Sequence, residues 1–161
     1  MSLLPFDRES FFTGKNWPDG PPLRLHFDEG RVYADITLDR NFEGYENVVF
    51  GGMLFGILDV IMWYSIVMGT RKICMTRKTD MEFLKPVMCG ITYRAEGELL
   101  RVEERDVWAT AWIRDKAGER YAQATALFRQ AKGVDNARSV SRFDFSGVSP
   151  EIKEIFLSAL T

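Results

Sequence analysis

Asp59 is the residue of this sequence whose type and position best suit chemistry. It is the only charged residue between Glu46 and Arg71, and it lies within a long apolar run. Burying a lone carboxylate is costly, so such a residue needs partners or a function. In an apolar pocket the pKa of a carboxyl group rises, and the group can then act as a general base. The alternative is a structural aspartate, hydrogen-bonded to neighbouring backbone or across a dimer contact.

Gly51 and Gly52 open the same apolar run. The first N–H groups of a helix have no partners within it, and with the helix dipole they attract negative charge. Such donors stabilise an oxyanion, and glycine lets a substrate carbonyl approach the backbone closely. The alternative is a plain transition from loop to helix, because one Gly-Gly pair is a weak signal.

A helix must position these residues, and the run from Gly51 to Val67 predicts one. It is rich in Met, Leu and Ile and is longer than a typical strand. Because it is apolar on nearly every side, we expect it to be buried on most sides. Gly69 is the predicted stop. The run is near the lower length limit for a membrane span and contains Asp59, so we expect a buried helix of a soluble protein and no membrane partner.

Strands are predicted on both sides of this helix. Two runs of period two, 23–27 and 32–38, flank Glu29 and Gly30 and predict a hairpin with one buried face. Residues 41–49 are typical of a loop. Short turns favour an antiparallel meander, with Gly97 as a bulge or bend. The four strands after the helix are predicted over 72–85, 91–103, 107–114 and 119–130.

The whole chain, residues 1–161, is predicted to be a single domain of the α+β class. Residues 1–20 are interpreted as a leader with a short helix over 6–12. In the tail, 131–161, residues 132–149 are polar and predicted to be extended. Residues 150–160 have helical spacing, with Ser149 as a candidate N-cap. One helix can cover one face of a curled sheet, and the other face and the edges then invite a second subunit.

Composition excludes several classes of protein. Hydrophobic residues make up 46% and charged residues 27% of the chain, which is typical of a globular domain. A net charge of -2 argues against a nucleic-acid partner. The two cysteines, Cys74 and Cys89, form no zinc-binding pattern with the single histidine, His26, so no metal is expected. The N-terminus does not resemble a signal peptide, and a reduced, cytoplasmic setting is the expectation.

Three segments resemble the acyl-CoA thioesterase superfamily with the hotdog fold, in particular its PaaI-like and 4-hydroxybenzoyl-CoA thioesterase-like members. Residues 43–59 resemble a loop ending in His-Gly-Gly, followed by a helix with an acidic residue two turns in. Residues 83–90 are similar to the family's strand end, and 115–119 with Ala122 and Ala124 are similar to its last hairpin. The resemblance runs from about Leu23 to Gln130.

This resemblance implies a fold and a reaction. The fold is a curved antiparallel sheet of about six strands wrapped around one long central helix. The activity is hydrolysis of an acyl-CoA thioester, with Asp59 as base or nucleophile, the Gly51 N–H as oxyanion donor, and Thr76 assisting the acid. The acid and the glycine of one site come from two subunits in the family, which implies a homodimer or a dimer of dimers. No cofactor is implied beyond the coenzyme A of the substrate.

Phe50 departs from the family pattern, because it stands where the family has histidine. Its ring cannot hydrogen-bond, although it can pack on an acyl group. Loss of that donor would cost a few kcal/mol in the transition state. A non-catalytic acyl or acyl-CoA binding module therefore stays open as a second hypothesis. Hydration or dehydration of an acyl thioester is a third, and it usually needs a histidine.

Further residues are candidates for substrate binding. Phe50, Gly52 and Phe55 lie where an acyl group or its carbonyl would pass, and Arg77 and Lys78 could meet coenzyme A phosphates. Ordinary core packing and a solvated charged strand are the alternatives. His26 is expected to face solvent, and Cys74 and Cys89 to be buried apolar fillers.

Overall fold

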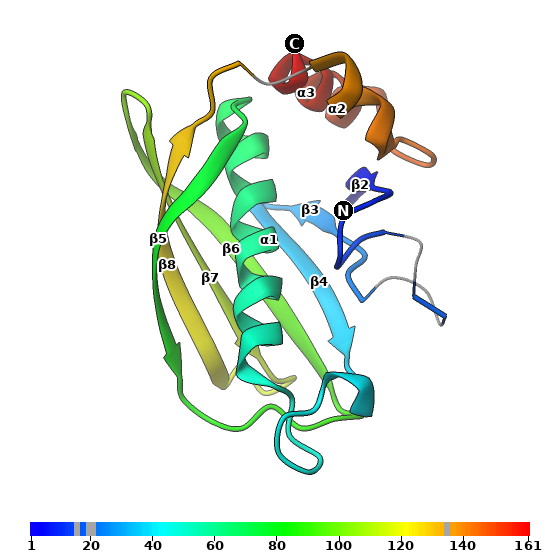
Figure 1. Cartoon of the computed structure of the whole chain (residues 1–161), viewed down its shortest axis with the longest axis vertical. Coiled ribbons are helices and arrows are strands. Elements are labelled where there is room, and N and C mark those ends of the chain that lie inside the picture. Colours follow the sequence, from blue (N-terminus) through cyan, green and yellow to red (C-terminus); the bar gives the residue numbers. More distant parts are fainter. Residues whose placement is uncertain (15–16, 19–21, 134–135) are drawn as a thin grey trace.

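The computed structural model describes residues 1–14, 17–18, 22–133 and 136–161. Within these residues, seven strands form one antiparallel sheet that curves around the long helix α1, and two short strands pair separately (Figure 1). The α+β hotdog architecture expected from the family resemblance is confirmed. In chain order the elements are β1 (Ser2–Leu3), β2 (Phe6–Asp7), β3 (His26–Asp28), β4 (Arg31–Thr37), the 3-10 helix η1 (Arg40–Phe42), α1 (Gly51–Thr70), β5 (Cys74–Phe83), β6 (Thr92–Glu103), β7 (Asp106–Arg114), β8 (Arg120–Gln130), α2 (Asn136–Arg142), β9 (Phe143–Asp144) and α3 (Pro150–Leu160).

Small side chains on the inner face of the sheet let α1 lie close to it. The inward positions of the central strands repeatedly carry alanine, including Ala95, Ala109, Ala111 and Ala124, all of them buried. Opposite them, α1 buries large side chains such as Ile57, Ile61 and Ile66. By length and apolar composition alone α1 is also long enough to cross a membrane, a test that the core helix of a soluble protein passes as well.

Two glycines have different roles from those predicted. Gly69 does not end α1. The helix continues to Thr70, and Arg71 takes the left-handed conformation with φ 56°. A Cβ atom on Gly69 would come within 2.7 Å of the Leu99 side chain, so this glycine permits close packing. Gly97 likewise faces Ile61 of α1, and the bulge of β6 falls at Leu100 instead.

The order of the strands corrects one part of the predicted topology. The sheet runs β1-β3-β4-β6-β7-β8-β5. The hairpin β3–β4 and the meander β6–β7–β8 are confirmed, and Glu29 and Gly30 both have positive φ, as a tight hairpin turn requires. The first strand after the helix, however, pairs with β8 and not with β6. Residues 84–91 lead from β5 at the edge of the sheet to β6 at its centre, a long-range choice that local turn signals do not reveal.

Both ends of the chain differ from the predictions made for them. The predicted helix over 6–12 is wrong, because Phe6 and Asp7 form β2 and pair with β9. The segment 132–149 is not simply extended, since it contains α2 and β9. Helix α3 is confirmed, and the Ser149 side chain accepts a hydrogen bond from the Ile152 N–H. In Figure 1, α2 and α3 lie over the C-terminal end of α1, with the N-terminal segment beside them.

Candidate active site

Asp59 and Thr76 meet between the middle of α1 and the start of β5. The Thr76 hydroxyl donates a hydrogen bond of 2.6 Å to the Asp59 carboxylate. No other hydrogen bond or ion pair reaches this carboxylate from the part of the chain that the structure describes. The sequence therefore correctly indicated two residues that come together, seventeen positions apart in the chain.

A bulge in β5 sets the direction of Thr76. Thr76 pairs with Phe128 of β8 and Lys78 with Leu127, so Arg77 is the extra residue. Side chains alternate between the two faces of a strand, and an extra residue resets that alternation. Thr76 consequently faces α1, as do Thr79 and Met81 further along the strand. Arg77 and Lys78 are exposed, as a solvated face would be.

The environment of Asp59 prepares it to act as a base. Burial raises the pKa of the Asp59 carboxyl group above its ordinary value, and the hydrogen bond from Thr76 opposes this rise. An apolar setting with one donor therefore leaves a carboxylate with unused acceptor capacity and a raised proton affinity. Asp59 also borders a pocket of about 300 Å³. It can thus receive a proton from a water molecule held at the pocket wall.

Gly51 begins α1, and its N–H is free to donate. Neither the Gly51 nor the Gly52 N–H has a hydrogen-bond partner among the described residues. The ring of Phe83, from the far end of β5, lies against Gly51, where a Cβ atom would come within 3.2 Å. Along a helix, eight residues span ~12 Å. Gly51 and Asp59 of the same chain are therefore too far apart to act on one carbonyl group.

Phe50 covers the start of α1 without capping it. It occupies the N-cap position, makes no side-chain hydrogen bond to the helix, and is 53% exposed. Its ring occupies the space beside Gly52, since a Cβ there would lie 2.4 Å from Phe50 Cε1. Phe55, one turn into α1, is also exposed. Both aromatic residues are thus available to a ligand or a second copy of the chain, as the prediction of substrate contact requires.

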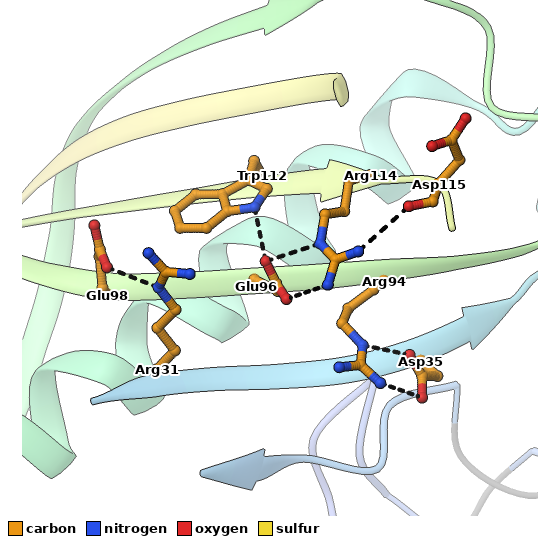
Figure 2. Close-up of polar contacts among 8 residues, drawn as sticks. All are labelled: Arg31, Asp35, Arg94, Glu96, Glu98, Trp112, Arg114 and Asp115. Carbon is orange, nitrogen blue, oxygen red and sulfur yellow. Dashed lines mark hydrogen bonds and ion pairs between the residues drawn. The ribbon is translucent and has the colours of Figure 1, made fainter. Parts of the chain in front are cut away.

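The sequence did not single out a second buried carboxylate, Glu96, on the outer face of the sheet. Figure 2 shows that Glu96 accepts hydrogen bonds from the Arg114 guanidinium at 2.9 and 3.1 Å and from the Trp112 indole at 2.9 Å. Burial alone would raise the pKa of Glu96, but Arg114, Trp112 and Arg31 outweigh burial and hold it below its ordinary value. Glu96 is therefore a fully paired structural anion. The charged residues that alternate along β6 and β7 were the sequence signal that could have predicted this ion pair.

Other predicted residues lie away from Asp59. His26 pairs with Tyr33 on the outer face of the sheet, as expected, and it is half-buried because its ring stacks on Tyr33 with centroids 5.3 Å apart. Cys74 is buried and Cys89 half-buried, and both are free thiols. Burial raises the pKa of both thiols, which makes them poor nucleophiles.

Comparison with known proteins gives the class of the protein from its fold. A crystal structure of a thioesterase superfamily protein superposes with a TM-score of 0.70 at 24% identity, covering 75% of this chain and 63% of that chain. The present chain thus spans less than two thirds of that relative. The PaaI protein of E. coli, from the phenylacetic acid degradation operon, superposes with a TM-score of 0.63 at 17% identity. The match covers 70% of this chain and 81% of that chain. A Streptococcus mutans protein bound to acetyl CoA superposes with a TM-score of 0.61 at 17% identity. The match covers 68% of this chain and 88% of that chain. These likenesses show a hotdog fold.

A family model also matches part of the sequence. Residues 46–122 match the model of the thioesterase superfamily. A search of curated proteins found no match. The match spans both Asp59 and Gly51, and together with the fold it confirms the predicted resemblance of this chain to the hotdog-fold thioesterase superfamily.

Proposed function

We propose that this protein hydrolyses the thioester bond of an acyl-CoA. The observation that carries the proposal is Asp59, a half-buried carboxylate in an apolar helix, with a raised pKa, a single donor in Thr76 and an adjacent pocket. Structural ion pairs such as that of Glu96 have the opposite character, since their carboxylates are fully paired. The match to the thioesterase superfamily model and a structural neighbour bound to acetyl CoA support a thioester substrate.

The proposed reaction uses three groups. The Asp59 carboxylate takes a proton from a water molecule, and the water oxygen forms a bond to the thioester carbon. The negative charge that develops on the carbonyl oxygen is stabilised by the Gly51 N–H at the start of a helix. When the carbon–sulfur bond breaks, the coenzyme A thiolate leaves and is protonated, and the acid product is released. Thr76 is a positioning residue that holds the orientation of Asp59.

Two copies of the chain are needed to assemble this site. Within the described residues β5 is an edge strand, hydrogen-bonded to β8 on one side only, and it exposes Met75 (68%) and Phe83 (56%). Edge strands of this kind pair with further strands. If two β5 strands paired antiparallel about a two-fold axis between Thr79 and Asp80, Thr76 of one copy would lie opposite Phe83 of the other. Asp59 would then face the Gly51 that Phe83 covers in the second copy.

A thiol-release assay tests the proposal. The protein and an Asp59→Asn variant are mixed with a panel of acyl-CoAs and a thiol reagent. We expect release by the wild type that the variant lowers by about a hundredfold or more. Glu96→Gln is the matched control, because it neutralises a buried acid remote from the site. Equal rates for wild type and Asp59→Asn would refute the proposed role of Asp59.

Phe50 favours a second candidate function, that of a non-catalytic acyl-CoA binding protein. Its exposed ring offers apolar contact and no hydrogen bond at the position where the family has histidine. The same acyl-CoA panel separates the two functions. Measurable binding without thiol release at any chain length supports the binding protein, and release that depends on Asp59 supports the hydrolase.

A further inference from the structure

The pocket beside Asp59 is closed by segments that lie outside the family match. Its described lining includes Asp59, Val60 and Trp63 of α1 and Ile73 before β5. The ends of the chain add both polar and apolar side chains: Asp7, Ser10, Ser139, Arg142, Phe143 and Leu160. Phe143 and Leu160 lie beyond residues 46–122. The hotdog core therefore supplies one wall of the pocket, and the ends of this particular chain supply the other.

The two ends of the chain are fastened to each other next to this pocket. We call residues 6–14 and 139–145 together the clasp. Strands β2 and β9 pair within it, and the Arg8 N–H donates to the Arg142 carbonyl oxygen at 2.9 Å. The Arg142 guanidinium binds the Asp7 carboxylate through two nitrogens, at 2.7 and 3.1 Å. A two-point ion pair of this kind fixes geometry as well as adding energy.

Aromatic packing holds the clasp against α1. Phe143 is buried, and its ring lies nearly parallel to that of Trp63, with an interplanar angle of 12° and centroids 6.3 Å apart. Trp63 is itself fixed, because its indole N–H donates to the Cys74 carbonyl oxygen at 3.1 Å. The wall that the clasp contributes therefore combines the Phe143 ring with the paired charges of Asp7 and Arg142. The Phe143 ring packs on Trp63, which lies four residues along the helix from Asp59.

We infer that the clasp sets the size of the acyl group, with Phe143 as the specificity-determining residue. The inference rests on the proposed function, since it takes Asp59 as the group at the thioester. A pocket of about 300 Å³ holds roughly ten water-sized groups. The substrate class is therefore an acyl group of up to about ten non-hydrogen atoms, packed against Trp63 and Phe143. We therefore expect such groups to be preferred over long-chain fatty acyl groups.

A chain-length series tests this inference. Values of kcat/KM are measured for acyl-CoAs from acetyl to hexadecanoyl, on wild type and on Phe143→Ala, which enlarges the pocket. Each buried methylene group is worth about 0.8 kcal/mol, so access to two more carbons raises kcat/KM on the longer substrates by about tenfold. Val60→Phe fills the pocket and shifts the optimum to shorter groups. Opposite shifts from two variants cannot arise from loss of stability alone.

Two further measurements complete the test. Phe145→Ala is the matched control, since Phe145 belongs to the same segment and contacts Phe143 but does not line the pocket. Its chain-length profile should equal that of the wild type.

The affinities of the same acyl-CoAs for Asp59→Asn, measured by calorimetry, report on the pocket without hydrolysis. If the wild type releases no thiol but these affinities follow the predicted profile, the hydrolase proposal fails and the pocket stands. Profiles for Phe143→Ala that match the wild type in both measurements would overturn the inference.

Discussion

Asp59 is half-buried and Glu96 is buried, and their surroundings give them opposite proton affinities. Glu96 is 8% exposed and is surrounded by cationic and indole donors, so its charged form is favoured. Asp59 has one neutral donor, the Thr76 hydroxyl, and its charged form is disfavoured by burial. A neutral side chain would serve a structural role at lower cost, so the Asp59 carboxylate supports the proposed catalytic role.

Asp59→Asn should stabilise the folded protein at neutral pH. The folded-state pKa of Asp59 lies above its unfolded value of 3.8. Between these two pKa values the folded state holds more protons than the unfolded state, so the free energy of unfolding falls as pH rises through this interval. The asparagine carbonyl can still accept the Thr76 hydrogen bond. We expect a gain of about 0.5–2 kcal/mol at pH 7, measured by urea denaturation, that disappears below pH 3.8. A loss of stability at pH 7 would show that the ionised carboxylate is well solvated or paired.

Thr76→Val should move the pH dependence of hydrolysis upward. The Thr76 hydroxyl stabilises the ionised form of Asp59, so its removal raises the pKa of Asp59 further. More of the base is then protonated at a given pH, and the acidic limb of the kcat/KM profile shifts to higher pH. We expect a fall of about tenfold near that limb. Thr76→Ser keeps the hydroxyl and should retain the wild-type profile.

At the scale of elements, the close contact between α1 and the sheet requires glycine at position 97 of β6. A Cβ on Gly97 would lie 2.6 Å from Ile61 and 2.9 Å from the Thr110 carbonyl oxygen. Because one of these atoms is backbone, the neighbours cannot simply move aside. Gly97→Ala should therefore cost about 1–3 kcal/mol in the free energy of unfolding. Thr125→Ala, at an exposed position of β8, should change it by less than about 0.5 kcal/mol.

Local patterns were sufficient for the elements that local interactions decide. The length and composition of an apolar run predicted α1, period-two runs predicted β3 and β4, and Ser149 predicted the start of α3. The pairing of β5 with β8 and of β2 with β9 depends on contacts between distant residues, which no local pattern contains. The helix α2 was missed for the same reason, because its segment is polar and Phe143 anchors it from beyond its end.

The candidate site was predictable only in part. Asp59 was identified because a lone charge in an apolar run is visible in sequence, and Thr76 and Gly51 followed from the family resemblance. The bulge at Arg77 that aims Thr76 at α1 has no local sequence signal, and the clasp beside Asp59 forms only when both ends of the chain meet. Glu96 could have been found from the alternation of charges on β6 and β7.

At the scale of the whole molecule, one copy of the chain holds only half of the proposed site. Asp59 and Gly51 are ~12 Å apart along α1, and β5 is left with an unpaired edge. We expect light scattering to give a mass in solution of twice the 18.5 kDa of the chain, or a higher even multiple. A monomer that hydrolyses acyl-CoA at full rate would contradict the two-copy site.

Gly51→Pro offers a way to remove one half of the site alone. Proline lacks the N–H yet is accepted at the first position of a helix, and Phe50 already has the extended ψ of 129° that suits a residue before proline. Gly51→Ala retains the N–H and brings a similar Cβ close to Phe83, so it controls for crowding.

Activity in mixed dimers of Asp59→Asn and Gly51→Pro is the most direct test of the account. Each variant alone should be nearly inactive. In a mixed dimer, the Asp59 of the Gly51→Pro chain meets the Gly51 N–H of the Asp59→Asn chain, so one site is intact. We predict recovery of about half the wild-type rate per mixed dimer. No recovery in dimers shown by mass to be mixed would contradict a site built from the acid of one copy and the amide of the other.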